Sequence, residues 1–148
     1  MAALFVIGTP IGNLGDITLR AIDTLREVTH VAAEDTRRTR QLLSHLDIHG
    51  KQLVALDAHA SEKRVAGLVE RLVAGESVAL VTDAGMPSVS DPGTALVRAA
   101  IEKGVTVTVI PGPSAVTAAV ALSGLVEGPF LFLGFLPNTH TQRIRLNS

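Results

Sequence analysis

Short apolar runs recur along this chain at intervals of roughly 25 residues, and this recurrence restricts the fold more than any other feature. The runs have the length and bounds of buried strands and occupy residues 4–7, 30–33, 53–56, 78–81 and 105–110. Segments with helical spacing of apolar residues lie between them, at residues 19–25, 42–46, 65–72 and 95–100. Strands that alternate with helices need crossover connections. The sequence therefore predicts an α/β fold with a mainly parallel five-stranded sheet and helices on both faces.

Capping residues support these element positions. Asp16 or Thr18 is placed to cap the first helix, and Ser61 the third. Gly75 and Gly104 lie just past the ends of two predicted helices, where a left-handed backbone commonly ends a helix.

Composition excludes several classes of chemistry. The 148 residues contain no cysteine, which rules out disulfides, thiolate zinc sites and cysteine nucleophiles. The five histidines show no metal-ligand spacing, so no metal site is predicted. No apolar run is long enough to span a bilayer and no signal peptide is recognisable, which favours a soluble cytoplasmic protein without a membrane partner. The net charge of −1 means that any nucleic-acid binding needs a local basic patch.

A change in amino-acid composition and pattern after residue 110 indicates a second domain. A proline- and glycine-containing stretch is followed by a helix of small residues at 115–122 and by an apolar run at 130–133 that we expect to be a strand. No helix that could cover this strand follows it. We therefore expect one domain at residues 1–125, and at 126–148 the start of a second α/β domain that continues further.

Four segments follow predicted strands, at the edge of a parallel sheet where ligands bind. We call them the first loop (residues 8–15), the second loop (34–40), the third loop (82–93) and the fourth loop (111–114). The glycines of the first loop permit close approach of a ligand, but its spacing matches neither a dinucleotide-binding nor a P-loop pattern, so ligand binding and simple turn formation both remain open. The third loop is long and irregular, which is typical of functional loops, although its end also suits the start of a helix.

The second loop concentrates charge. It contains the carboxylates Glu34 and Asp35 and the arginines Arg37, Arg38 and Arg40. One interpretation is a helix start with Asp35 as N-cap and the arginines in water. The other is a site where guanidinium groups bind phosphate or ribose.

Taken together, the four loops resemble the tetrapyrrole methylase superfamily of class III S-adenosylmethionine methyltransferases, and within it the enzymes that methylate ribosomal RNA of the small subunit. The motifs that carry the resemblance occur in one order, at residues 8–18, 33–37, 83–87, 90–93, 111–115 and 134–137. Met86 departs from the family's threonine and Ser61 from its asparagine, without loss of a group to which we assign chemistry. After Pro137 the family pattern continues with a basic stretch and a further domain.

The resemblance implies a homodimeric two-domain enzyme that binds S-adenosyl-L-methionine between its domains and methylates the 2′-oxygen of a cytidine ribose in 16S ribosomal RNA of the small subunit. The residues that would contact the cofactor are Pro10, Ile11, Gly85, Met86, Val89, Ser114 and Ala115. Arg37, Arg38 and Arg40 would contact RNA.

A base within hydrogen-bond reach of the ribose hydroxyl would assist the transfer. Our catalytic candidates are Asp35 and Glu34, followed by Asp83 and His59. A tetrapyrrole or protein acceptor, or a binding module without catalysis, remain alternatives, although an arginine cluster suits a polyanion better than an apolar macrocycle.

Overall fold

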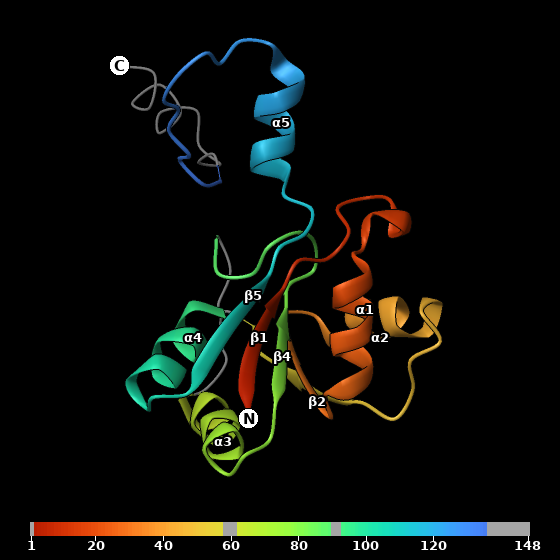
Figure 1. Ribbon diagram of the computed structural model, residues 1–148, viewed down its shortest axis with the longest axis vertical. Helices are drawn as coiled ribbons and strands as arrows, with labels where there is room; N and C mark the ends of the chain where they lie inside the picture. Colours follow the sequence, from red (N-terminus) through yellow and green to blue (C-terminus); the bar gives the residue numbers. More distant parts are fainter. Residues whose placement is uncertain (1, 58–61, 90–92, 136–148) are drawn as a thin grey trace. The chain divides into compact units, whose positions relative to one another are not determined.

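Five parallel strands form the centre of the computed structural model, which describes residues 2–57, 62–89 and 93–135. They are β1 (Ala3–Ile7), β2 (His30–Ala33), β3 (Gln52–Ala55), β4 (Val78–Val81) and β5 (Thr106–Ile110). Their order in the sheet is β3-β2-β4-β1-β5, and every neighbouring pair is parallel (Figure 1). The predicted five-stranded sheet is confirmed.

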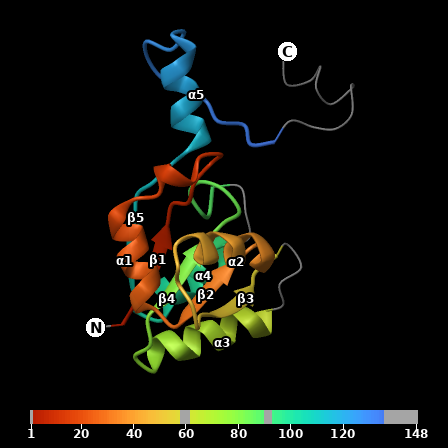
Figure 2. The same cartoon turned by 90° about the vertical axis from the view of Figure 1, so that its right-hand side faces the viewer.

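Two helices cover each face of the sheet, which lies between the α1–α2 pair and the α3–α4 pair (Figure 1 and Figure 2). Helices α1 (Leu19–Glu27) and α2 (Thr36–His45) pack on one face, over a core that includes Leu25 and Val31. Helices α3 (Glu62–Val73) and α4 (Gly93–Glu102) pack on the other, over a core that includes Leu68 and Leu96. Because both faces are covered, two of the three inner strands, β2 and β4, are buried along their whole length and contain mostly apolar residues.

The helix ends largely follow the predicted caps. Thr18 caps α1 by accepting a hydrogen bond from the Ala21 amide at 3.1 Å, whereas Asp16 instead ends a short 3-10 helix, η1 (Leu14–Asp16). Gly75 and Gly104 have φ values of +98° and +71°, as expected for residues that follow a helix. Ser61 lies outside the described residues.

An arginine covers a backbone carbonyl on each outer strand. Arg20 of α1 donates to the Val109 carbonyl of β5 at 3.1 Å, and Arg64 of α3 donates to the Ala55 carbonyl of β3 at 3.2 Å. Edge strands otherwise present unpaired backbone groups to other chains. These two side chains therefore help to protect the sheet edges.

The chain divides into the units Met1–Ala115 and Val116–Ser148. The division falls at the start of α5 (Ala115–Ser123), which has no buried residue, whereas the sequence-based boundary at residue 125 assigns this helix to the first domain. Residues 130–133, expected to be a strand, do not form one. A strand needs a neighbour that pairs with its backbone groups, and within the described residues this segment has none. No helix among the described residues is long and apolar enough to cross a membrane.

Two glycines allow the backbones that follow β1 and β5 to touch. A Cβ atom added to Gly8 would lie 2.7 Å from the backbone N and Cα of Gly112, and also 2.7 Å from the Met86 sulfur. A Cβ on Gly112 would lie 2.9 Å from the Gly8 carbonyl oxygen. A side chain at either position would have to push the other backbone away, so the first and fourth loops can meet only through glycine.

We expect Gly8→Ala to lower the free energy of unfolding by about 1–3 kcal/mol, because the new methyl group overpacks against backbone. The control is Gly67→Ala on α3, where an added Cβ meets nothing within 4 Å. This change should raise stability by about 0.5–1 kcal/mol, since alanine is the better helix former. Urea denaturation of the two variants measures both effects, and a neutral Gly8→Ala would show that the two loops are not held in contact.

Candidate functional site

Strands β1 and β4 are neighbours whose chains leave the sheet toward opposite faces. After β1 the chain continues into η1 and then α1 on one face, and after β4 it continues into α4 on the other (Figure 1). In open α/β sheets, ligands bind in the crevice at the carboxyl ends of such a strand pair. The first and third loops both begin at this point.

A reciprocal backbone pair joins these two loops. The Thr9 amide donates to the Gly85 carbonyl and the Gly85 amide donates to the Thr9 carbonyl, both at 3.0 Å. The Thr9 side chain is 2% exposed, and its hydroxyl lies 3.3 Å from the Thr82 carbonyl and 3.4 Å from the Gly85 carbonyl. The Thr9 hydroxyl can therefore donate its one hydrogen to either carbonyl oxygen, and both carbonyls lie at the loop junction.

Thr9 and Thr82 were not singled out by sequence. Both are threonines at the end of a buried apolar strand: Thr9 follows β1 after Gly8, and Thr82 directly follows β4 and is 8% exposed. A hydroxyl at such a position must find a partner when it is buried. A threonine at the end of a buried apolar strand is therefore the sequence feature that could have identified the loop junction.

The fourth loop meets the same junction. A Cβ atom added to Gly85 would lie 3.4 Å from a methyl carbon of Ile11 and 3.4 Å from the Pro113 carbonyl oxygen. Gly85 itself has φ +82°, a conformation that other residues adopt only with strain. The first, third and fourth loops thus converge at Gly85, as expected if they form one site.

The expected cofactor-contact residues differ in how much surface they offer. Ile11 and Val89 are exposed by 38% and 51%, although both are apolar. Pro10 and Ser114 are half-buried and Ala115 is exposed. The Met86 side chain lies close to Gly8 and packs against the core beneath α3 and α4, so a ligand at this position would meet mainly its backbone.

Three carboxylates lie where β2 and β4 end. Glu34 accepts a hydrogen bond from the Thr82 hydroxyl at 3.1 Å. Asp83 accepts one from the Asp35 amide at 3.1 Å and lies 3.8 Å from Nε of Arg38. These contacts connect the second loop to the third. His59, the remaining candidate base, lies outside the described residues.

Asp35 is the N-cap of α2, as one interpretation of the second loop predicted. Its carboxylate accepts from the Arg37 amide at 2.9 Å and pairs with the Arg37 guanidinium at 3.3 Å. The side-chain hydrogen bond from Arg37, followed by that from the Arg37 backbone, lowers the pKa of Asp35. The charged form therefore stabilises the folded chain above the unfolded-state pKa, and this contribution is lost as the pH falls through the lower folded-state value. A carboxylate with a lowered pKa is also a weaker proton acceptor.

The three arginines of the second loop are not equivalent. Arg37 is paired with Asp35, and Arg38 faces Asp83. Arg40 is exposed, and no hydrogen bond or ion pair of its side chain is found in the described part of the chain. Arg40 and Arg37 share a shallow hollow of about 460 Å³ along α2 with Gln41 and Ser44.

A second hollow, of about 300 Å³, separates the first loop from α2. We call it the switch-point hollow, and its lining residues are Thr9, Pro10, Leu14, Arg38, Thr39, Gln41, Leu42, Thr82 and Asp83. It therefore adjoins both the loop junction and the charged second loop.

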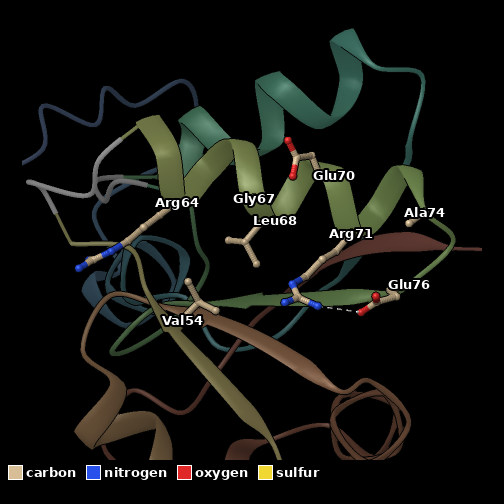
Figure 3. Close-up of a pocket in the computed structure, with 8 residues that line it drawn as sticks. All are labelled: Val54, Arg64, Gly67, Leu68, Glu70, Arg71, Ala74 and Glu76. Atoms are coloured by element: carbon tan, nitrogen blue, oxygen red, sulfur yellow. Dashed lines mark hydrogen bonds and ion pairs between the residues drawn. The ribbon is translucent and has the colours of Figure 1, made fainter.

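A third hollow, of about 450 Å³, lies along α3 beside the outer strand β3 (Figure 3). Its lining includes two arginines and two glutamates, and Arg71 points across it to Glu76, with 3.5 Å between the paired atoms. The hollow is balanced in charge and contains none of the predicted site residues.

The family model of the tetrapyrrole (corrin/porphyrin) methylases matches residues 3–145. A protein named ribosomal RNA small subunit methyltransferase I from Xylella fastidiosa is 53% identical over 140 residues, which is 95% of this chain and 51% of that protein. A protein of the same name from Thermotoga maritima is 49% identical over 148 residues, which is 100% of this chain and 66% of that protein. The chain thus spans between about half and two thirds of the length of these relatives.

A solved structure shares the fold. The uroporphyrin-III C-methyltransferase of Thermus thermophilus superposes with a TM-score of 0.61 at 22% identity, over 87% of this chain and 55% of the other. The sheet order, the converging loops and the match along almost the whole sequence agree, and the chain belongs to the tetrapyrrole methylase family.

Proposed function

We propose that this chain provides the methyl-donor side of an S-adenosyl-L-methionine-dependent methyltransferase that acts on the 2′-oxygen of a cytidine ribose in 16S ribosomal RNA. The observation that carries the proposal is the convergence of the first, third and fourth loops at Gly85, in a chain that is 53% identical to a protein named ribosomal RNA small subunit methyltransferase I. We include in the proposal a cytoplasmic homodimer with the small ribosomal subunit as its partner.

The loop residues fit an adenosyl ligand. Ile11 and Val89 leave apolar surface exposed at the carboxyl ends of the strands, which suits a purine face. Gly85 and Gly12 have no side chain to block the approach of a ligand, and a Cβ on Gly12 would meet nothing within 4 Å. Ligand contacts would therefore come from apolar side chains and from bare backbone.

When bound, the donor supplies a methyl group on a sulfonium, so that an S–C bond breaks as an O–C bond forms and a neutral thioether leaves. The ribose hydroxyl proton must pass to a base. Glu34 and Asp35 are the carboxylates that we place in this catalytic region. Glu34 is the better acceptor of the two, because Asp35 is committed to its cap and to Arg37.

The direct test is transfer of labelled methyl from the donor to small subunits that lack the modification, with full-length protein that contains this chain. We expect labelled 2′-O-methylcytidine in the RNA. Donor binding without transfer to RNA would favour a binding module, and transfer only to a tetrapyrrole or a protein would favour the other family reactions.

Ile11→Ser tests the donor side of the site. We expect donor affinity to fall about tenfold or more, because burying an aliphatic side chain contributes about 1.5–3 kcal/mol. The control Ile101→Ser removes an isoleucine that is 61% exposed on α4, and should leave affinity unchanged. Isothermal titration calorimetry measures both variants. Equal affinity in the two would remove the first loop from the donor site.

Replacement of the carboxylates tests the proton acceptor. Glu34→Gln should lower kcat about 100-fold or more, the usual contribution of a positioned base. Asp35→Asn should retain most of kcat, because asparagine caps helices as well as aspartate does, whereas Asp35→Ala should lower the melting temperature because the cap is lost. Single-turnover assays and thermal unfolding separate these effects. A loss in Asp35→Asn that matches Glu34→Gln would assign the proton to Asp35 instead.

Charge replacement tests contact with RNA. Of the three arginines proposed to contact phosphate, Arg40 is the one whose guanidinium pairs with no carboxylate in residues 2–57, 62–89 and 93–135. Arg40→Gln should reduce the slope of log K against log salt by about 0.7, the value for one contact to a single strand. Arg37→Gln should reduce this slope by less than about 0.7. Arg26→Gln, at the distant end of α1, should leave the slope unchanged. An unchanged slope in Arg40→Gln would show that Arg40 lies on a solvated helix face and does not contact RNA.

A further inference from the structure

We propose that the switch-point hollow receives one nucleoside of the acceptor RNA, extruded from its strand. The proposal rests on the methyl transfer to RNA proposed above and adds the place where the acceptor is held.

The position of the hollow suits an acceptor. Thr9 and Pro10 line it, and they belong to the first loop, whose Ile11 lies at the proposed donor site. On its other side the hollow is bounded by α2 and the second loop, which contain the arginines proposed to bind phosphate. A nucleoside in the hollow would thus lie between the methyl donor and the contacts to its own backbone.

The lining of the switch-point hollow combines apolar surface, a guanidinium group and hydrogen-bonding side chains, which together suit a nucleobase. Pro10, Leu14 and Leu42 provide apolar surface for the faces of a base. Arg38 adds a guanidinium plane, on which bases stack in proteins, and so compensates for the scarcity of aromatic side chains. The side chains of Gln41 and Asp83 supply hydrogen-bond donors and acceptors for the base edge.

Two of the lining polar groups have no hydrogen-bond partner among the described residues. Thr39 is 4% exposed, yet no hydrogen bond of its hydroxyl is found within the described ranges, and the same holds for the Gln41 amide. A buried hydroxyl without a partner is unfavourable unless a ligand or water pairs with it. The Thr39 oxygen is not among the fully enclosed unpaired atoms, so it can be reached from the hollow.

The size of the hollow restricts what it accepts. About 300 Å³ is at the lower end of the range for small-molecule sites, which suits a single nucleoside and is small for a macrocycle. A base inside it cannot remain stacked on its neighbours, because the first loop and α2 lie on either side. The nucleotide must therefore leave its stack, as in other enzymes that modify single nucleotides.

Filling the hollow from its rim tests the proposal. Leu14 is 43% exposed, so Leu14→Trp should fold normally and block the hollow. In full-length protein we expect kcat/KM for small subunits to fall about tenfold or more, while donor affinity measured by calorimetry stays unchanged. The matched control is Leu19→Trp, five positions on along the chain, at a leucine that is 81% exposed and does not line the hollow.

A second pair of variants tests the hydrogen bond itself. Thr39→Val removes the hydroxyl but keeps the shape, and should lower kcat/KM without changing the salt dependence of RNA binding, because no charge is lost. Thr39→Ser retains the hydroxyl and should recover most of the activity. Equal losses in the two variants would overturn the contact with Thr39.

The outcomes separate this proposal from the function on which it rests. If wild-type protein does not methylate small subunits, the proposed function fails. If wild-type protein methylates small subunits and Leu14→Trp has the same kcat/KM as Leu19→Trp, only the proposal that the hollow receives the acceptor is overturned. A Leu14→Trp variant that also loses donor binding would assign the hollow to the donor and overturn the proposal.

Discussion

The reciprocal hydrogen bonds between Thr9 and Gly85 hold the site together. They fix the first loop to the third at the point where β1 and β4 end, and both strands have a neighbour on each side in the sheet. A Cβ atom added to Gly85 would lie 3.4 Å from a methyl carbon of Ile11 and 3.4 Å from the Pro113 carbonyl oxygen, so the fourth loop passes close to the same residue. The shape of the loop junction is therefore set by backbone pairing and close packing rather than by flexible side chains.

A chain of polar contacts extends this order to the second loop. The Thr9 hydroxyl reaches the Thr82 carbonyl, the Thr82 hydroxyl binds Glu34, and Asp83 binds the Asp35 amide. Each contact joins segments that are far apart in sequence but follow strands of one parallel sheet. The N-terminus of α2, with its arginines, is thus positioned relative to the proposed donor loops by hydrogen bonds at the end of β4.

The sequence predicted the sheet, its helices and most caps because each depends on local information. Apolar runs predict strands, and a residue such as Thr18 caps its own helix. The unformed strand at residues 130–133 shows the limit of that reasoning, since a strand also needs a partner that no local pattern specifies. For the same reason the contact of Gly8 with Gly112 and the hollow beside Thr39 were not predicted. Both depend on which loops the strand order brings together.

The donor side and the acceptor side of the proposed site consist of different kinds of groups. They should therefore differ in how they tolerate amino-acid substitutions. The donor side combines the apolar side chains of Ile11 and Val89 with glycine and backbone groups. A side chain added at Gly8 or Gly85 would displace the neighbouring loops. The acceptor side combines residues of the first loop, such as Leu14, with side chains of α2, such as Thr39 and Gln41, and α2 lies outside the donor loops. Substitutions on α2 can therefore alter the choice of acceptor while the donor loops keep their shape. Such a separation would allow one fold to serve proteins named for different acceptors, such as ribosomal RNA and uroporphyrin-III.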